Sequence, residues 1–210
     1  MKIAREGFPW ILAAFFGALI ALGLGWSWVS VICVLFGLAF AGFFRDPERK
    51  GSTEPGVVLA PADGRVVAVG KASGIPGAAS EQGTRISIFL SLLDVHVNRA
   101  PIQGRVEAVQ YRPGRFLAAF KEEASRANEQ NAVRLVEKTG RAVEIVQIAG
   151  LLARRIICYV KEGQDLESGQ RLGIIVFGSR VDTILPEGFE AAVSEGQRVK
   201  GGETVLGRLS

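Results

Sequence analysis

The sequence contains one histidine, His96, and only two cysteines, Cys33 and Cys158. A single imidazole excludes metal sites that need several histidines and catalytic dyads built from two imidazoles. Both cysteines lie in apolar runs far apart in the chain, so we expect neither a disulfide between them nor a cysteine-based metal site. The sequence therefore predicts no metal site and leaves one histidine for acid-base chemistry.

Charged residues are absent from Phe8 to Phe44, so all of them lie outside this segment. One straight helix of this length would measure roughly 55 Å, against about 30 Å for a bilayer core. The stretch Gly23–Trp28 supplies flexible glycines and interfacial tryptophans for a turn near its middle. We therefore predict a transmembrane hairpin of two helices, at residues 8–24 and 27–44.

Positive charge flanks this segment on both sides, at Lys2, Arg5, Arg45, Arg49 and Lys50. The positive-inside rule then places both ends in the cytoplasm. A signal peptide is the competing interpretation, but the apolar segment is too long and lacks a clear small-residue cleavage site. We expect residues 1–45 to anchor the chain in the cell membrane, with the domain that follows facing the cytoplasm.

The net charge of +4 raises the question of a nucleic-acid partner. The basic residues are scattered and do not cluster with aromatic residues, so no nucleic-acid partner is predicted. Attraction to anionic membrane lipids is the simpler explanation.

Residues 46–55 resemble a polar linker, and residues 56–210 alternate short apolar runs with turns. One helix is indicated weakly, at Phe116–Ser125. The expected strands are Gly56–Ala60, Arg65–Val69, Arg85–Leu90, Arg105–Tyr111, Val133–Glu137, Ala142–Ile148, Arg155–Lys161, Arg171–Phe177 and Asp182–Leu185.

Two internal similarities refine this fold class. Ala60–Val69 matches Ala100–Val109, and Val160–Gln164 with Leu172-Gly173 is echoed by Val193–Gln197 with Leu206-Gly207. Glu-Gly-Gln turns followed by glycine-bounded strands are typical of lipoyl-like modules, and so few copies exclude a solenoid. We predict a mainly β chain, with a barrel-sandwich or lipoyl-like β domain after the helical hairpin.

Three positions are candidates for chemistry. Asp63 stands where the matching repeat has Gln103, so the scaffold does not require a carboxylate there; an Asx turn is the structural alternative. Polar and apolar residues alternate from Asp94 to Asn98, which predicts that Asp94, His96 and Asn98 share one face of an extended segment. An imidazole beside a carboxylate can act as a base. A purely structural role for His96 is the alternative.

Ser179 follows an apolar strand and Gly178. Glycine leaves its own carbonyl open to attack, and a hydroxyl just beyond it is placed for an N-to-O acyl shift. An ordinary turn is the alternative. Together, Asp63, His96 and Ser179 supply an acid, a base and a nucleophile.

Five blocks carry a resemblance to a known family. They are Phe43–Pro47, Pro61–Gly64, Asp94–Pro101, Asn128–Asn131 and Phe177–Arg180. In order and spacing they resemble the phosphatidylserine decarboxylase family, in its short membrane-anchored bacterial and archaeal form.

The resemblance implies that the proenzyme cuts itself between Gly178 and Ser179. Ser179 becomes a covalent pyruvoyl cofactor, and a large chain and a small chain remain together as a heterodimer. In the family triad, Asp63 would orient His96 and His96 would activate Ser179. A Schiff base between the pyruvoyl group and phosphatidylserine would then lead to phosphatidylethanolamine.

Two departures from the longer bacterial members leave a question open. Those members usually have a second histidine at the position of Arg99 and a threonine at that of Arg180. Either His96 serves both self-cleavage and decarboxylation, or self-cleavage uses another base.

The substrate contacts also stay open. Phosphate contacts are expected from one or more of Arg65, Arg85, Arg105, Arg112 and Arg115. Phe116–Phe120 is either an interfacial lid or a core helix. Two alternative functions remain, a non-enzymatic membrane-anchored lipoyl-like adaptor and the same chemistry on an archaeal ether-linked serine phospholipid.

Overall fold

The computed structural model describes residues 2–52, 54–72, 83–119, 123–151, 155–176 and 178–209. The chain divides into two compact units, Met1–Glu48 and Arg49–Ser210. Each unit is described by itself.

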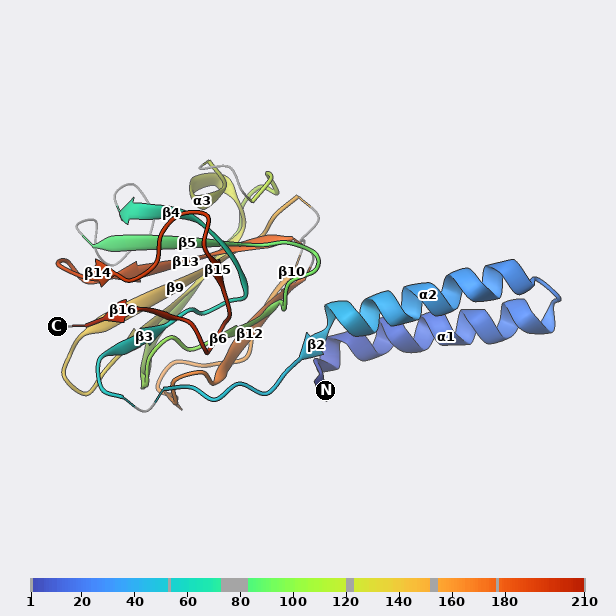
Figure 1. Ribbon diagram of the computed structural model, residues 1–210, viewed down its shortest axis with the longest axis horizontal. Coiled ribbons are helices and arrows are strands. Elements are labelled where there is room, and N and C mark those ends of the chain that lie inside the picture. Colours follow the sequence, from blue (N-terminus) through green and yellow to red (C-terminus); the bar gives the residue numbers. More distant parts are fainter. Residues whose placement is uncertain are drawn as a thin grey trace. The chain divides into compact units, whose positions relative to one another are not determined.

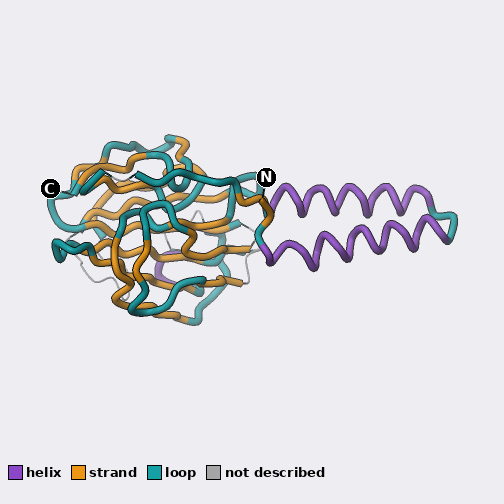
Figure 2. Tube along the Cα trace, turned by 90° about the horizontal axis from the view of Figure 1, so that it is seen from below, coloured by secondary structure: helices purple, strands orange, loops and turns teal. Residues whose placement is uncertain are grey.

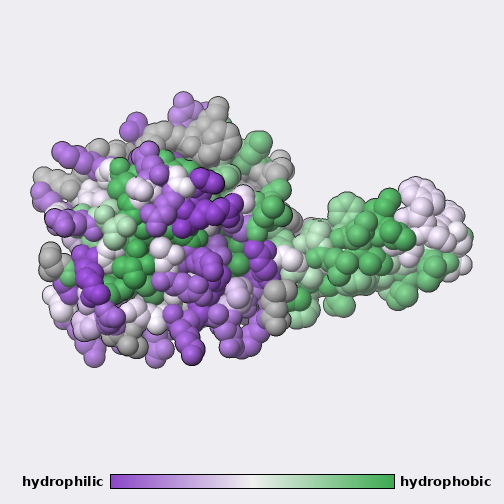
Figure 3. Space-filling model, viewed as in Figure 1, coloured by the Kyte–Doolittle hydropathy of each residue, from purple (hydrophilic) through white to green (hydrophobic). Residues whose placement is uncertain are grey.

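The first unit is a hairpin of two apolar helices. Its elements are β1 (Lys2–Ile3), η1 (Arg5–Gly7), α1 (Phe8–Gly23), α2 (Ser27–Phe43) and β2 (Arg45–Asp46). Small residues lie between the helices, where Ala18, Ala21 and Gly37 are buried and Ser30 Oγ donates to the Ala18 carbonyl at 2.9 Å. The larger apolar side chains point outward and cover the hairpin with an apolar surface (Figure 3). Such a surface suits a hydrocarbon environment.

The two ends of the hairpin lie side by side. Strands β1 and β2 pair antiparallel, with Lys2 opposite Asp46. At the far end Gly25 has a φ of 79° and the Trp26 N–H donates to the Ala21 carbonyl at 2.8 Å, which closes the turn. By length and composition, Arg5–Gly23 is apolar enough to cross a membrane, whereas Ser27–Phe43 is shorter. These features support membrane association.

The second unit is built from β-strands (Figure 1, Figure 2). An eight-stranded sheet has the order β11-β7-β8-β9-β13-β5-β4-β15, and two three-stranded sheets have the orders β10-β12-β6 and β14-β16-β3. The elements are β3 (Val57–Leu59), β4 (Gly64–Lys71), β5 (Thr84–Leu90), β6 (Val97–Arg99), β7 (Gly104–Arg112), α3 (Ala124–Ala127), β8 (Gln130–Val136), β9 (Ala142–Ile148), β10 (Arg155–Cys158), β11 (Asp165–Leu166), β12 (Arg171–Val176), β13 (Ser179–Leu185), β14 (Glu190–Ala191), β15 (Arg198–Val199) and β16 (Val205–Arg208).

The main core lies on one face of the curled eight-stranded sheet, between it and the small sheets. Ile88 and Val181 of the large sheet share this core with Leu172 of β12 and Leu206 of β16. A smaller cluster on the other face packs Ile148 and its neighbours against α3. Strand β13 is therefore buried on both faces along its whole length.

The sequence repeat corresponds to a pseudo-twofold arrangement of strands. Gly64 of β4 lies opposite Val199 of β15, and Gly104 of β7 lies opposite Leu166 of β11. Both β4 and β7 carry a register shift at the same place in the repeat. Strands β3 and β6 match likewise, each paired with a strand that follows one of the Glu-Gly-Gln turns. The strands of each sequence repeat, with their partner strands, therefore form one half of the sandwich.

Most of the sequence-based fold prediction is confirmed. The chain is mainly β after an apolar helical hairpin, and each expected strand is present. The lipoyl-like assignment stays a prediction. The expected helix at Phe116–Ser125 is wrong over Phe116–Ala119, which is not helical; residues 120–122 lie outside the described residues, and Ala124 and Ser125 begin the short helix α3. The reason is a contact with a residue farther along the chain: the Leu117 N–H and C=O both bind the Asn128 side chain, at 2.9 and 2.8 Å, instead of helical partners.

Candidate active site

Several strand ends meet at one end of the second unit. Strand β5 ends at Leu90, opposite Ser179 at the start of β13, and Ile148 at the end of β9 lies opposite Arg180. Strand β12 ends at Val176 in a three-stranded sheet, and the chain then enters the eight-stranded sheet at Ser179. The Gly178–Ser179 bond therefore lies where the chain crosses between two sheets.

The backbone at Gly178 is held in a conformation that favours glycine. Its φ is 62°, and a Cβ there would meet nothing within 4 Å. Its carbonyl lies directly against Gly150, because a Cβ on Gly150 would be 2.1 Å from the Gly178 oxygen. Sequence reasoning missed Gly150; its only signal was a glycine just after an apolar strand.

The Ser179 hydroxyl is buried and unbonded. Ser179 is 0% exposed, and its Oγ has no hydrogen-bond partner among the described residues. A buried hydroxyl without a partner loses its hydration without compensation, so such groups are rare unless they have another role. This hydroxyl belongs to the residue directly after the Gly178 carbonyl.

His96 is buried beside this peptide bond, with an exposure of 1%. Its Nδ1 lies 2.9 Å from the Asp94 carbonyl oxygen, and its Nε2 lies 3.4 Å from the Gly178 N–H. A carbonyl oxygen only accepts, so the proton belongs on Nδ1 and the Nε2 lone pair accepts from the Gly178 N–H, which belongs to the peptide bond just before the Gly178–Ser179 bond. The unprotonated imidazole nitrogen therefore lies against the backbone of Gly178, one residue before Ser179.

The segment leading to His96 differs from the expected extended face. The strand begins only at Val97, and Asp94 lies in a turn. The Asp94 carboxylate accepts from the N–H and the hydroxyl of Ser91, at 2.9 and 2.6 Å. Asp94 therefore shapes the turn and orients His96 through its backbone carbonyl.

Asp63 lies at the same end of the sheet. Arg65 of β4 and Arg180 of β13 both lie opposite Phe89 of β5, on its two sides. Asp63 and Gly178 each precede these arginines by two residues, so they lie at matching heights along the sheet. Two strand spacings, or ~10 Å, separate them. The Asp63 carboxylate accepts from Arg49 at 3.0 Å and from the Gly201 N–H at 2.8 Å. A bond between Asp63 and His96 stays a prediction.

A buried ion pair secures the start of β13 on its other face. Arg180 and Asp182, which are 1% and 0% exposed, are paired at 2.6 Å. Arg180 also donates to the Ser87 hydroxyl of β5 at 2.7 Å, and Asp182 accepts from Ser125 of α3 at 2.9 Å. The residue that follows Ser179 is thus fixed by groups from other elements.

The arginines named as phosphate candidates are spread over the domain. Arg65 donates to the Gly196 carbonyl and Arg112 to the Arg126 carbonyl, whereas Arg85 is nearly buried. Arg105 borders a cavity in the other half of the sandwich. Arg115 is exposed and begins the partly buried segment that leads to the buried Ala119, whose Cβ lies close to Gly150. Phosphate binding by these residues stays a prediction.

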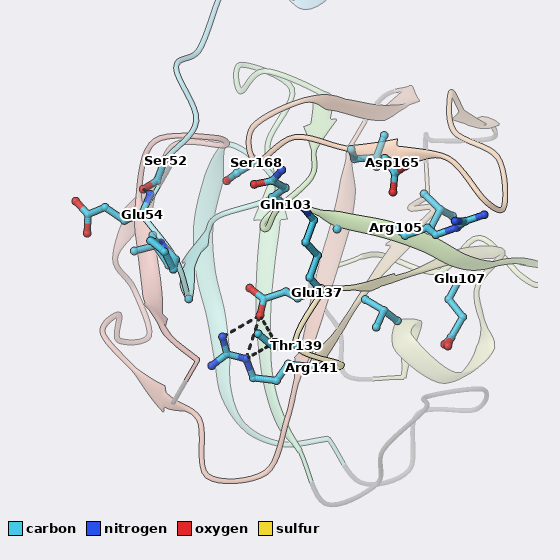
Figure 4. Close-up of a pocket in the computed structure, with 18 of the residues that line it drawn as sticks. Ser52, Glu54, Gln103, Arg105, Glu107, Glu137, Thr139, Arg141, Asp165 and Ser168 are labelled. Carbon is cyan, nitrogen blue, oxygen red and sulfur yellow. Dashed lines mark hydrogen bonds and ion pairs between the residues drawn. The ribbon is translucent and has the colours of Figure 1, made fainter.

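A cavity of about 1040 Å³ lies in the other half of the sandwich (Figure 4). It is lined by Gly56, Gln103 and Arg141, among others. In the pseudo-twofold arrangement Gly56 corresponds to His96, Gln103 corresponds to Asp63, and Arg141 corresponds to Ser179. Figure 4 shows the Arg141 guanidinium bonded to Glu137, in place of a free nucleophile. This cavity is therefore the counterpart of the candidate site without its reactive groups.

Comparison with known proteins identifies the family. The family model for phosphatidylserine decarboxylase matches residues 36–207. A phosphatidylserine decarboxylase proenzyme from Burkholderia cenocepacia is 45% identical over 213 residues, covering 99% of this chain and 96% of the relative. One from Ralstonia nicotianae is 46% identical over 210 residues, covering 99% and 95%. One from Cereibacter sphaeroides is 48% identical over 210 residues, covering 98% and 89%. This chain therefore belongs to the phosphatidylserine decarboxylase family.

Proposed function

We propose that this chain decarboxylates phosphatidylserine to phosphatidylethanolamine, with a pyruvoyl group that it makes from Ser179 by cutting itself after Gly178. The observation that carries this proposal is the buried, unbonded Ser179 hydroxyl beside the Gly178 carbonyl, with His96 Nε2 at 3.4 Å from the Gly178 N–H. Family membership supports the reaction, and this geometry supports the residues.

The cleavage requires a base, a nucleophile and an open carbonyl. His96 Nε2 removes the proton from Ser179 Oγ, and the oxygen attacks the Gly178 carbonyl carbon. The amide C–N bond breaks, an ester forms, and the proton passes to the freed nitrogen of residue 179. Elimination then releases the chain that ends at Gly178, and hydrolysis of residue 179 liberates ammonia and leaves the pyruvoyl group.

The residues around position 179 fit such a group. Among the residues that the structure describes, none forms a hydrogen bond with the Ser179 hydroxyl that would have to break, and Gly178 has no side chain to block departure of the cut end. The pyruvoyl group supplies an electron sink for loss of carbon dioxide. His96 remains beside it as the proton donor, held in one orientation by the Asp94 carbonyl. Asp63 is proposed to assist His96.

The two chains produced by cleavage are expected to stay together as a heterodimer. The small chain begins with β13, which pairs with β5 on one side and β9 on the other. It also supplies β15 and β16, which pair with β4 and β3 of the large chain. Separation would break these ladders and expose the core.

The helical hairpin suits a lipid substrate. We infer that residues 1–45 anchor the enzyme in the cell membrane and that residues 46–55 link the anchor to the catalytic domain, residues 56–210. The ends of the hairpin lie together, and positive residues flank both. By the positive-inside rule the catalytic domain faces the cytoplasm, where it meets the lipid head group.

Two variants test this function. Ser179→Ala should remain one uncut chain that releases no carbon dioxide from carboxyl-labelled phosphatidylserine. Release of carbon dioxide by Ser179→Ala would refute the assignment of the pyruvoyl group. His96→Ala tests the dual role: cleavage without decarboxylation would confine His96 to the second reaction.

A matched assay separates the remaining alternatives. Diacyl phosphatidylserine and its ether-linked analogue are compared at equal surface concentration in detergent micelles. Selective turnover of the ether lipid would support the archaeal-type substrate. An adaptor would turn over neither lipid and would purify uncut, and family membership already argues against it.

A further inference from the structure

We propose that Asn98 binds the carboxylate of the substrate head group through its side-chain N–H. This inference rests on the proposed function and deepens it, because it names the group on the lipid that one buried side chain recognises. Three observations carry it: an unpartnered donor, its place beside His96, and the apolar residue at the equivalent position of the other half.

The Asn98 side chain ends a short relay of buried amides. Asn131 Nδ2 donates to Gln147 Oε1 at 3.0 Å, and Gln147 Nε2 donates to Asn98 Oδ1 at 2.8 Å. Asn98 is 0% exposed, and its Nδ2 has no hydrogen-bond partner among the described residues. A buried N–H without an acceptor has lost its hydration without compensation, so a bound group that accepts from it would recover this free energy.

The relay ends at the candidate site. Asn98 is the central residue of β6, and His96 directly precedes this strand. Gln147 lies opposite Val181 of β13, two residues from Ser179 and on the same face of that strand. We infer from these neighbours that the free donor of Asn98 faces the side of β13 from which Ser179 projects.

The other half of the sandwich shows that the fold does not need a polar residue here. Asn98 lies opposite Gly173, and its counterpart Val58 lies opposite Gly207. Val58 is buried in the hydrophobic core, and a ring, Phe189, packs at Gly207 where the Gln147 amide packs at Gly173. A buried amide replaces valine only in the half that contains His96 and Ser179. This difference points to function.

A carboxylate is the ligand that suits this donor. It accepts hydrogen bonds and lacks donors of its own, and a bond from a neutral amide to a charged acceptor is stronger than a neutral pair. The neutral amide orients the carboxylate without forming an ion pair, and an ion pair would oppose the loss of carbon dioxide. The product, phosphatidylethanolamine, lacks this group and forfeits the bond, which favours product release.

The test uses two lipids that lack an amine and so cannot react. Short-chain phosphatidyl-3-hydroxypropionate keeps the carboxylate, and short-chain phosphatidylpropanol has a methyl group in its place. Dissociation constants are measured by calorimetry on the purified, self-cleaved enzyme in detergent. For Asn98→Leu we expect affinity for the carboxylate lipid to fall about ten- to hundredfold, with affinity for phosphatidylpropanol unchanged.

Controls keep folding separate from recognition. Thr183→Val removes another buried, unpartnered polar atom four residues along β13 and should leave both affinities unchanged. If Asn98→Leu fails to fold, Asn98→Ser is used instead. The serine side chain is shorter and cannot reach the carboxylate, so this variant should show the same selective loss of affinity for the carboxylate lipid. Equal affinities in wild type and variant, or equal loss for both lipids, would overturn the inference.

The failure of the proposed function is a different result. If the wild-type chain purifies uncut, the pyruvoyl assignment fails whatever Asn98 does. If the wild type is cut and turns over phosphatidylserine while the Asn98 variants bind both lipids normally, only the Asn98 inference fails.

Discussion

Gly150→Ala is the perturbation that tests the packing around the scissile bond most sharply. The new Cβ would lie 2.1 Å from the Gly178 oxygen and 3.1 Å from the Ala119 Cβ, where ordinary contact begins at 3.4 Å. Overpacking of this kind costs about 1–3 kcal/mol. Relief requires the Gly178 carbonyl to move by about 1 Å, and such a misplacement of a reacting group can slow a reaction about a hundredfold.

The assay is a time course of self-cleavage, followed by intact-mass spectrometry from the first appearance of the chain in cell-free synthesis. Gly70→Ala is the matched control, because it also replaces a strand-region glycine without positive φ and its Cβ would meet nothing within 4 Å. We expect Gly150→Ala to cut far more slowly than Gly70→Ala. Equal rates would refute the inference that Gly150 positions the carbonyl.

Three further outcomes follow from the contacts. Arg180→Met leaves Asp182 buried without its cation, so thermal or chemical unfolding should show a loss of about 3–5 kcal/mol, partly restored when Asp182→Leu is added; no restoration would contradict the pairing. Asn128→Ala removes the side chain that fixes the Leu117 backbone, and limited proteolysis should then cut near Leu117 faster than in wild type. Asp63→Asn weakens the ion pair with Arg49, and its self-cleavage rate, measured by intact mass, should fall; an unchanged rate would make Asp63 structural.

The periodicity and turn chemistry of the sequence predicted much of the fold. Apolar runs bounded by glycine marked the strands, and the long charge-free segment marked the hairpin, because these signals depend on neighbouring residues alone. The failure at Phe116–Ala119 has a different cause. There a distant side chain, Asn128, satisfies the backbone groups that a helix would have used, and no local pattern shows such a contact.

The candidate site was predictable only in part. The sequence repeat singled out Asp63 by comparison with Gln103, and the same comparison of Asn98 with Val58 was available in the sequence. That comparison gained meaning only once the structure showed an unpartnered, buried amide. Gly150 could not be found from the sequence, because its importance is its close approach to the Gly178 carbonyl, where the neighbouring strands β9 and β13 end and begin.

Arg180, which stands where the longer family members have a threonine, has a structural role here. Arg180 is not exposed at the cleavage point; it is buried on the opposite face of β13 and bonded to Asp182 and Ser87. Adjacent residues of a strand point to opposite faces, so Arg180 secures the strand while Ser179 faces His96. The departure at Arg180 thus concerns how the strand is held.

The central claim is that the Gly178–Ser179 bond is cut and that residue 179 becomes a pyruvoyl group. Intact-mass spectrometry of the purified wild-type chain tests it most directly. The account predicts two chains, a large one ending at Gly178 and a small one whose mass equals residues 179–210 with a pyruvoyl group in place of the serine amino terminus. A single chain of full mass, or a small chain with a free serine amine, would contradict it.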